Sequence, residues 1–405
     1  MIPFSPPYID DDILNEVKET LLSGWITTGI KVKEFEQEIA KISGVNQVLC
    51  VNSATSGLML VLKWFGVGEG DEVIVPSYTY CATALAVYHL GAKVVMVDVN
   101  DDFTINPEKV REAITPNTKV IIPVDIAGWP AHYDEIHGIV NDPTIQKKFY
   151  AKTEEQKLLN RILVLSDAAH SLGAYYNGKP TGSLTDITVF SFHAVKNITT
   201  AEGGAICINL GSPFKHEEVF KMMKLMCMNG QTKDAYSKTT GKEWRYDIIL
   251  SGFKMNMPDV CAAIGLAQIR KYRSILLPRR KFIAHRYQDL FKKFKWAQLP
   301  VLHKDNTESS YHLYPLRVHG ISEIQRDAII DEIIAHSVSV NVHFIPMPML
   351  SVFRNMGYKI EDHPEAFNNY SREISLPIYP QLTDDQVDYI VDVFVKAYNS
   401  ITGNV

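Results

Sequence analysis

Residues 47–76 read QVLCVNSATSGLMLVLKWFGVGEGDEVIVP, and this stretch decides the fold class. It opens with a short apolar run at 47–51 that has the pattern of a buried strand. Apolar residues at helical spacing follow, and a second strand-like run occupies 71–76. Strand, helix and strand in this order are typical of a parallel or mostly parallel sheet with helices on both faces.

The same alternation continues through the first two-thirds of the chain. A helical pattern, CATALAVYHLG, covers 81–91, and further strand-like runs lie at 93–99, 118–126, 161–167, 185–192 and 204–209. The sequence therefore predicts an α/β fold with a mostly parallel central sheet flanked by helices. In such sheets, functional sites gather at the carboxyl ends of the strands.

The pattern changes near residue 270, and the length of 405 residues exceeds what one core usually supports. A long helix broken near Pro278 is predicted over 265–294. A C-terminal lobe follows it, with strands at 312–318 and 338–345 and a terminal helix after LTDDQ (382–386). We therefore expect a large domain over 1–270 and a smaller α+β domain over 271–405. The charged stretch 133–160 is predicted to be a surface helical excursion and not a separate domain.

Composition excludes several classes of function. A net charge of −5 gives no electrostatic reason to expect nucleic acid or an anionic membrane as a partner. The five cysteines are scattered without a C-x-x-C pair, which fits neither a disulfide framework nor a zinc site. The N-terminus lacks the pattern of a secretory signal, and no apolar run is long enough to span a bilayer. We expect a soluble cytoplasmic protein with no metal site.

Three segments at the ends of predicted strands carry polar or aromatic residues. Each of them allows a structural and a functional interpretation. Asp167 ends the run RILVLSD and either caps the next helix or supplies a counter-charge for a protonated ring nitrogen. VNSATSGL (51–58) either caps a helix or points N–H groups and the Thr55 hydroxyl at an anion. It has neither the P-loop pattern nor G-x-G-x-x-G. Tyr80 either stacks on a planar ring or is a half-buried core tyrosine.

The segment SFHAVKNITTAEGG (191–204) contains one lysine, Lys196, among small and hydroxylated residues. Most lysines are solvated surface charges, and that is the alternative reading here. Taken together, however, the four segments offer an anion-binding turn, an aromatic ring that can stack on a ligand, a carboxylate and an amine. Pyridoxal phosphate needs each of them, because it takes a lysine Schiff base, an acidic partner for its pyridinium and an anchor for its phosphate.

These segments make the chain resemble the DegT/DnrJ/EryC1/StrS family of pyridoxal-phosphate-dependent sugar aminotransferases, which has the fold-type I aminotransferase fold. The resemblance covers essentially the whole chain. It extends through SGWITTG (23–29), SDAAHSLGA (166–174), GFKMNMPDVCAAIGLAQI (252–269), HLYPLRV (312–318), VNVHFIP (340–346) and SLPIYPQLT (375–383). Within the family, the stretch around Lys196 and the GFKMNM variant most resemble the branch that aminates UDP-linked 4-keto pentoses.

The resemblance implies a role for each matching residue. Lys196 is expected to form the Schiff base and then act as general base, while Asp167 holds the ring nitrogen protonated. The other residues expected to bind the cofactor are Ala54, Thr55, Tyr80, His170, Ser191 and Asn256. The family's sites lie at a homodimer interface, so Asn256, with Lys254 as a further candidate, is expected to reach the phosphate of the partner subunit. The residues expected to bind substrate are Trp25, Thr28, His193 and His343; His312 matches a family position without an assigned role.

The implied reaction moves an amino group from L-glutamate to the keto carbon of a nucleotide-linked ketosugar, in the synthesis of a surface polysaccharide or lipopolysaccharide sugar. Family members that are 3-dehydratases have histidine in place of this lysine, so Lys196 favours transamination. The alternatives are another pyridoxal reaction, such as elimination or amination of a carbocyclic ketone, and a non-catalytic regulatory relative. The chain departs from the family at Asp125, at Met347–Pro348 and in the length of 133–160.

Overall fold

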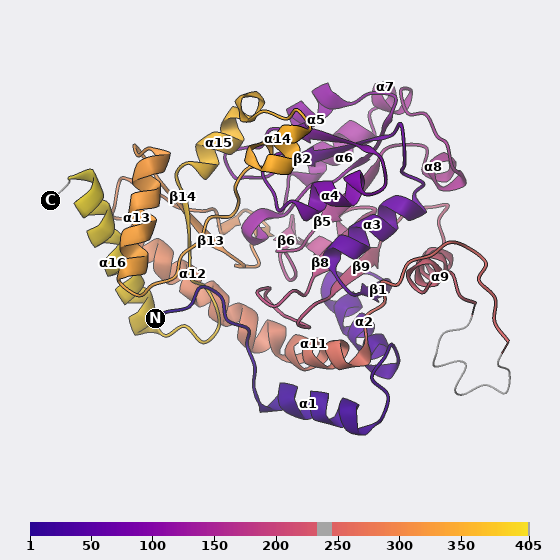
Figure 1. The fold of residues 1–405 in the computed structure, drawn as a ribbon, viewed down its shortest axis with the longest axis horizontal. Helices are drawn as coiled ribbons and strands as arrows, with labels where there is room; N and C mark the ends of the chain where they lie inside the picture. The colour runs from indigo at the N-terminus through magenta and orange to yellow at the C-terminus, as the bar shows by residue number, and fades with distance from the viewer. Residues whose placement is uncertain (233–244, 404–405) are drawn as a thin grey trace.

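A seven-stranded sheet forms the centre of the computed structural model, which describes residues 1–232 and 245–403 (Figure 1). Its strands, in spatial order, are β1 (Gln47–Val51), β9 (Gly204–Ile208), β8 (Ile187–Ser191), β5 (Leu163–Asp167), β4 (Thr118–Ile121), β2 (Glu72–Pro76) and β3 (Lys93–Val97). β9 is antiparallel to both of its neighbours, and the remaining strands all point the same way. The seven predicted strands and the mostly parallel sheet are confirmed.

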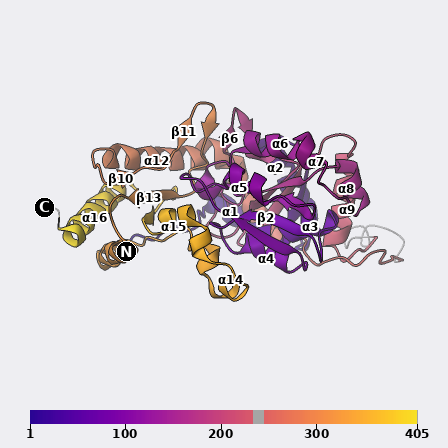
Figure 2. The same cartoon turned by 90° about the horizontal axis from the view of Figure 1, so that it is seen from above.

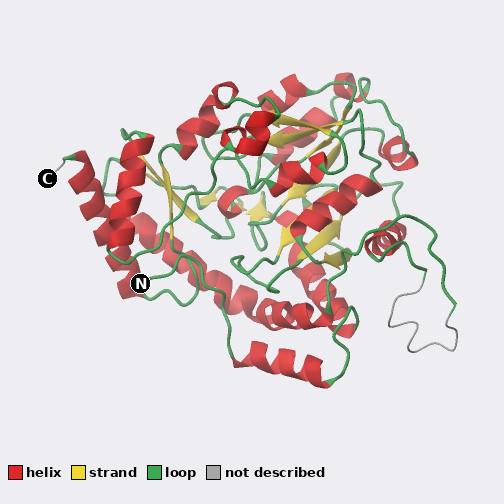
Figure 3. Ribbon diagram, viewed as in Figure 1, coloured by secondary structure: helices red, strands yellow, loops and turns green. Residues whose placement is uncertain are grey.

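Helices cover both faces of this sheet, as Figure 3 shows. Alternate strand residues point to opposite faces, so Leu49 and Val51 pack on one side while Val48 and Cys50 pack on the other. The first face is covered by α3 (Ala54–Trp64), α4 (Ala82–Tyr88) and α9 (His216–Cys227). The second is covered by α2 (Ile30–Ser43), α5 (Pro107–Ala113), α6 (Tyr133–Val140) and α11 (Asp259–Lys271), with α1 (Asp11–Leu22) packed outside α11. Burial on two faces explains why the strands are almost wholly apolar.

The excursion over 133–160 is helical, as predicted, and consists of α6, α7 (Pro143–Gln146) and α8 (Glu154–Leu159). It is not confined to the surface, because Ile136 and Ile139 of α6 are buried in one cluster with strand residues Ile121 and Val164. The ammonium of the buried Lys119 on β4 also donates to the carbonyl of Tyr150 at 2.5 Å. This segment is therefore an integral layer of the large sheet's core.

Helix α11 runs through a π-helical turn at Tyr272–Leu276 into α12 (Leu277–Phe291), with Pro278 in its first turn. The helix does not end there, but its regular hydrogen-bonding pattern is interrupted just before Pro278, as predicted, because proline has no N–H to donate to the carbonyl four residues earlier. The C-terminal residues build a second sheet of β10 (Ala297–Gln298), β13 (Tyr314–Val318) and β14 (Glu373–Leu376). Helices α12 and α13 (Glu323–Ala335) both pack against α16 (Asp384–Thr402) at this end of the molecule (Figure 1), and Figure 2 shows α12 and α16 from above.

The terminal helix after LTDDQ is confirmed as α16, which begins with a capping box between Thr383 and Gln386. The strand predicted at 338–345 is wrong. Only isolated bridges join Val338 to Ile2 and Asn341 to Ser375. The N–H of Val342 is bound by the side chain of Asn341 at 2.8 Å, and side chains that take up backbone donors in this way compete with ladder formation.

Short elements complete the chain. A small sheet combines β11 (His303–Lys304), β12 (Thr307–Glu308), β6 (Tyr175–Tyr176) and β7 (Lys179–Pro180), and two further helices are α14 (Ser351–Asn355) and α15 (Pro364–Tyr370). Ile2 packs into the C-terminal core, so the first residues cross the boundary expected at 270/271. That division into domains stays a prediction. No helix within 1–232 or 245–403 is long and apolar enough to cross a membrane.

Candidate active site

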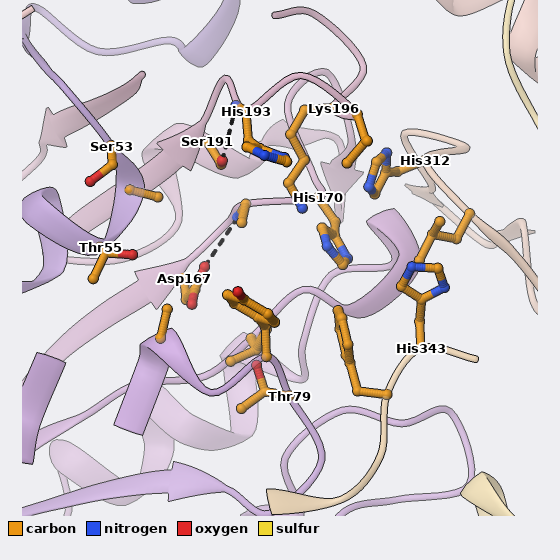
Figure 4. A pocket seen from close by; sticks show the side chains of 18 of the residues that line it. Ser53, Thr55, Thr79, Asp167, His170, Ser191, His193, Lys196, His312 and His343 are labelled. Atoms are coloured by element: carbon orange, nitrogen blue, oxygen red, sulfur yellow. Dashed lines mark hydrogen bonds between the residues drawn. The ribbon is translucent and has the colours of Figure 1, made fainter. Parts of the chain in front are cut away.

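A cavity of about 560 Å³ opens at the carboxyl ends of β5 and β8, beside the first turn of α3 (Figure 4). Its lining includes many of the residues selected from the sequence: Ala54, Thr55, Tyr80, Asp167, His170, Ser191, His193, Lys196, His312 and His343. Distant segments of the chain supply them, and the parallel sheet brings the segments to one edge. The sequence-based grouping of these residues is therefore matched by one cavity.

Asp167 lies at the end of β5 and is 6% exposed. One carboxylate oxygen accepts a hydrogen bond from the Thr83 hydroxyl at 2.8 Å, and the other accepts from the Ala169 N–H at 3.3 Å. Burial raises the pKa of Asp167, whereas these two hydrogen bonds and the positive charge of Lys196 favour its ionised form. Residues 168–174 form turns, so Asp167 caps no helix and its carboxylate belongs to the cavity.

Lys196 lies in the loop between β8 and β9, and its side chain extends into the cavity toward His170 (Figure 4). It is half-buried, so the reading as a solvated surface lysine is wrong. Among the described residues, its ammonium makes no hydrogen bond or ion pair. Desolvation lowers the pKa of Lys196 to about 8, and the negative charge of Asp167 partly opposes that shift. The amine is therefore available as a nucleophile and base close to neutral pH.

The first turn of α3 forms another wall of the cavity. The Ser53 hydroxyl caps the helix by accepting from the Ser56 N–H at 3.1 Å, so the helix-capping reading of VNSATSGL is confirmed. The neighbouring Ala54 and Thr55 line the cavity, where the helix N-terminus also favours an anion. The first turn of α3 can pack closely against β9 because residue 204 of that strand is a glycine. A Cβ at Gly204 would lie only 2.6 Å from the Ala54 nitrogen.

Two neutral histidines, His170 and His312, line the cavity together with Lys196. His170 Nδ1 accepts from the Ala127 N–H at 3.2 Å, which assigns the ring hydrogen to Nε2. His312 Nδ1 lies 2.9 Å from Asn197 Oδ1, and the Asn197 amide donates to the Ser310 carbonyl, so His312 donates from Nδ1. Burial, reinforced by the charge of Lys196, holds the pKa of both imidazoles well below the usual range.

Aromatic residues enclose the side of the cavity near His343. Tyr80 is 61% exposed and lines the cavity, so its reading as a core tyrosine is wrong. Phe344 stacks near His170 with ring centres 5.8 Å apart. Phe4 stacks on His343 at 5.3 Å. Sequence reasoning missed Phe4 and Phe344, and no local pattern marks Phe4, which reaches the site only because the N-terminal segment pairs with 337–339.

A second cavity, of about 400 Å³, contains other residues selected from the sequence. Asn256 and Thr28 line it, and the Asn256 amide donates to the Thr28 hydroxyl at 2.7 Å. The Trp25 indole donates to the Thr28 carbonyl at 3.2 Å, and Lys254 is exposed nearby on the same segment as Asn256. These four residues do not line the cavity of Lys196 within one chain.

The residues at two of the three places where the chain departs from the family pattern are buried. Asp125 accepts hydrogen bonds from the Tyr133 and Ser171 hydroxyls, both at 2.6 Å. Its backbone N–H donates to the Asp167 carbonyl at 3.2 Å, so it lies beside the end of β5. Burial raises the pKa of Asp125 to about 6. Met347 is buried in the core of the large sheet, while Pro348 beside it is also buried. Neither Asp125 nor Met347 lines the cavity of Lys196.

These observations fit pyridoxal phosphate. The cofactor's aldehyde, ring nitrogen and phosphate need three anchors. The site offers a lysine amine without a partner in the described part of the chain, a buried carboxylate, and a helix N-terminus packed on a glycine. The cavity is large enough for a ring and a small substrate together. Fold and site thus define the class of pyridoxal-phosphate aminotransferases of fold-type I.

Comparison with known proteins makes the assignment specific. The sequence matches the profile of the DegT/DnrJ/EryC1/StrS aminotransferase family over residues 7–147 and 151–395, and the chain belongs to this family. The spore coat polysaccharide biosynthesis protein SpsC of Bacillus subtilis is 35% identical over 399 residues, covering 96% of this chain and 95% of that protein.

Comparison with solved structures supports the same family assignment. The putative sugar aminotransferase Spr1654 of Streptococcus pneumoniae, in its PMP form, is 42% identical with a TM-score of 0.95, covering 99% of this chain and 100% of that one. Helicobacter pylori PseC, an aminotransferase involved in pseudoaminic acid biosynthesis, is 27% identical with a TM-score of 0.86, covering 98% and 99% of the two chains. A PLP form of Spr1654 is also similar. The expected family, fold and cofactor are confirmed, and the protein is an aminotransferase that uses pyridoxal phosphate.

Proposed function

We propose that this aminotransferase moves an amino group from L-glutamate to the keto carbon of a nucleotide-linked ketosugar that is used for a surface polysaccharide. The observation that carries the proposal is one cavity in which Lys196 and Asp167 face the same space, in a chain of this family. Support for a sugar comes from relatives described as acting in spore coat polysaccharide and pseudoaminic acid biosynthesis. UDP-linked 4-keto pentoses are the narrower candidate within this substrate class.

In this proposal the chain's own residues divide the work of holding the cofactor. Ala54, Thr55 and Ser191 bind the phosphate at the first turn of α3 and the end of β8. Asp167 would pair with the ring nitrogen, and Tyr80 would contact the ring. His170, whose Nε2 carries the ring hydrogen, would offer a hydrogen-bond donor to the cofactor. When bound, pyridoxal phosphate supplies an electron sink next to the reacting carbon and carries the amino group.

Lys196 has two tasks. Its Nζ would hold the cofactor covalently, and the same amine, when free, would take up and return a proton at the substrate carbon. A pKa of about 8 suits both tasks, because far more of the amine is neutral near physiological pH than at the ordinary pKa of lysine. His170 and His312 stay neutral and add no competing positive charge. Lysine at this position also favours amino transfer over dehydration.

The substrate assignment is tested with a panel of nucleotide-linked 3- and 4-ketosugars and one carbocyclic ketone, each with L-glutamate as donor. We expect 2-oxoglutarate and an aminated nucleotide sugar to form in equal amounts with at least one ketosugar. Amination of the carbocyclic ketone alone would contradict the nucleotide-sugar proposal. Release of water without amine incorporation would instead identify an elimination reaction.

We further propose that two chains form a homodimer in which each site takes Asn256 from the partner subunit. Thr28 and Asn256 lie in a cavity separate from that of Lys196, so one chain alone does not bring them to the cofactor. The segment next to Thr28 exposes the large apolar side chains Leu22, Ile26 and Ile30. Exposed apolar side chains gathered in this way are typical of an association surface.

Mixing two inactive variants tests this shared site. We expect Lys196→Ala and Asn256→Ala to be weakly active or inactive alone, and to regain about a quarter of wild-type activity when they are unfolded and refolded together. Random pairing gives half heterodimers, and each heterodimer contains one intact site out of two. Activity of the mixture equal to the mean of the separate variants would show that Asn256 serves the site of its own chain. Wild-type protein carried through the same refolding is the control.

Gly204→Ala is expected to lower both stability and cofactor affinity. The added Cβ would lie 2.6 Å from the Ala54 nitrogen and 2.7 Å from the Ser53 carbonyl carbon, so the first turn of α3 must shift. We expect a loss of about 1–3 kcal/mol in the free energy of unfolding. Denaturant unfolding of the apoprotein and a titration with pyridoxal phosphate measure the two effects. Gly211→Ala is the matched control, because no atom of the described residues, apart from Gly211 and its two chain neighbours, lies within 4 Å of the added Cβ. Equal effects from both variants would contradict the packing argument.

A further inference from the structure

A buried carboxylic acid that the proposed chemistry does not use lies next to the active site. Glu373 on β14 is 0% exposed. One of its oxygens lies 2.5 Å from the Ser375 hydroxyl, and the other accepts the backbone N–H of His343 at 3.0 Å. His343 lines the cavity of Lys196, so Glu373 contacts the active-site wall from behind.

Ser375 connects this acid to the imidazole. The Ser375 hydroxyl lies 2.9 Å from His343 Nδ1, which completes a chain from Glu373 through Ser375 to the ring. The His343 carbonyl accepts from the Tyr78 hydroxyl at 2.7 Å, and Phe4 stacks on the ring. Because His343 Nδ1 is hydrogen-bonded to Ser375, Nε2 is the ring nitrogen that can interact with a molecule in the cavity. Figure 4 shows His343 beside His170 and His312 at the side of the cavity remote from Ser53 and Thr55.

The ring of His343 carries a single hydrogen at physiological pH. Burial and the nearby charge of Lys196 lower the pKa of His343 to about 3, so the imidazole is neutral. A neutral imidazole has its hydrogen on Nδ1 or on Nε2, and the partner of one nitrogen decides the state of the other. The hydroxyl of Ser375 accepts or donates equally well, so Glu373 decides the direction of the chain.

Two arrangements satisfy every group in the chain. With Glu373 ionised, the Ser375 hydroxyl donates to it, His343 Nδ1–H donates to Ser375, and Nε2 presents a lone pair to the cavity. With Glu373 protonated, its O–H donates to Ser375, the Ser375 hydroxyl donates to Nδ1, and the ring hydrogen is on Nε2. Going from the second arrangement to the first releases one proton from Glu373 to solvent, while the ring hydrogen moves from Nε2 to Nδ1 and the ring charge is unchanged.

We infer that Glu373 is a positioning residue whose proton, relayed through Ser375, makes His343 present an N–H donor at Nε2 to the active-site cavity. A donor at this wall fits an acceptor oxygen of the substrate, such as a keto, hydroxyl or carboxylate oxygen. Only that last step rests on the proposed function. The link between Glu373 and the His343 tautomer depends on the chain alone.

The charges around Glu373 set the pH range. Burial raises the pKa of Glu373 to about 8, against the hydrogen bonds from Ser375 and the His343 N–H and the charges of Arg326 and Arg317. Arg326 comes from α13 and Arg317 from the neighbouring β13. Tyr78, just beyond the end of β2, and the imidazole of His343 are further titratable groups that face this carboxyl. The protonated arrangement therefore holds at neutral pH and gives way above about pH 8.

Nitrogen NMR of the holoenzyme labelled with ¹⁵N-histidine reads the tautomer directly, because protonated and bare ring nitrogens have well-separated shifts. His343→Gln identifies the signals of residue 343. In the wild type we expect hydrogen on Nε2 near pH 6 and on Nδ1 near pH 10, roughly two units either side of the Glu373 pKa. The same tautomer at both pH values would overturn the inference.

Glu373→Gln is the discriminating variant. The glutamine carbonyl still accepts the His343 N–H, and its NH₂ donates to Ser375 as a protonated acid does. We expect the hydrogen to remain on Nε2 at both pH values. In Ser375→Ala, which breaks the relay, we expect no change of tautomer with pH. A Glu373→Gln or Ser375→Ala protein that switches like the wild type would refute the relay.

A kinetic readout extends the inference to the substrate. Glu373→Gln is expected to remove the part of the rise in KM for the acceptor that occurs above about pH 8 in the wild type, with kcat near neutral pH changed less than about twofold. The NMR result needs no substrate. A failed ketosugar assay with a confirmed tautomer switch would therefore count against the proposed function and leave the relay standing, whereas a missing switch would count against the relay alone.

Discussion

Lys196→Ala is expected to abolish amino transfer, lowering kcat by about 10⁴-fold or more. The variant loses both the amine that binds the cofactor and the base that moves the proton, and general base catalysis alone is worth roughly 10²- to 10⁴-fold. We also expect the visible absorbance of the lysine-bound cofactor to be absent. Steady-state kinetics and a visible spectrum after incubation with pyridoxal phosphate measure these two effects.

The same substitution is expected to leave the fold intact. The Lys196 ammonium makes no hydrogen bond or ion pair among the described residues, and desolvation disfavours its charge. Removing it therefore leaves no buried partner unsatisfied, and the unfolding midpoint of the apoprotein is expected to stay close to that of the wild type. Lys196→Arg is the matched control, because it keeps a positive charge without a nucleophilic amine. Wild-type turnover in either variant would contradict the assignment of Lys196.

Asp167→Asn is expected to lower kcat by roughly 10²- to 10⁴-fold, which is the usual size of the contribution from one group that controls a proton. Asparagine has the same shape: its carbonyl oxygen can still accept from the Ala169 N–H, and its NH₂ can donate to the Thr83 hydroxyl, which can also act as an acceptor. It lacks the negative charge that keeps a ring nitrogen protonated. We expect the cofactor still to bind through Lys196, with the loss seen mainly in the half-reaction with the amino donor.

Thr83→Val provides the control for Asp167→Asn. It removes the 2.8 Å hydrogen bond to the carboxylate but keeps the charge, so its effect is expected to be limited to about 1–3 kcal/mol in the activation free energy. Near-normal activity of Asp167→Asn would remove Asp167 from the site. Equal losses from both variants would show that the hydrogen bond, and not the charge, is what matters.

Much of this fold could be predicted because its strands are buried on both faces. Each of the seven strands is a short, almost wholly apolar run, so β1 and its neighbours stand out without an alignment. The catalytic candidates could be found for the same reason. Asp167 and Ser191 each end such a run, and parallel strands place their carboxyl ends at one edge.

The remaining features depend on contacts between residues distant in the sequence. The segment 338–345 alternates like a strand, yet side chains of Asn341 and Glu373 bind its N–H groups, and only the folded chain brings Glu373 there. Phe4 reaches the cavity through pairing of the N-terminal residues with 337–339. The relay through Ser375 could not be predicted from the sequence either. Nothing in SREISL (371–376) indicates that Glu373 is buried beside an active-site histidine.

The visible spectrum of the purified wild-type protein, recorded before and after addition of L-glutamate, tests the central claim most directly. The claim is that Lys196 binds pyridoxal phosphate and releases it to an amino donor. We expect an absorbance band of the lysine-bound cofactor that fades as glutamate is added, with one 2-oxoglutarate released per site. A protein that shows no such band after incubation with pyridoxal phosphate, or a band that no amino donor alters, would contradict it.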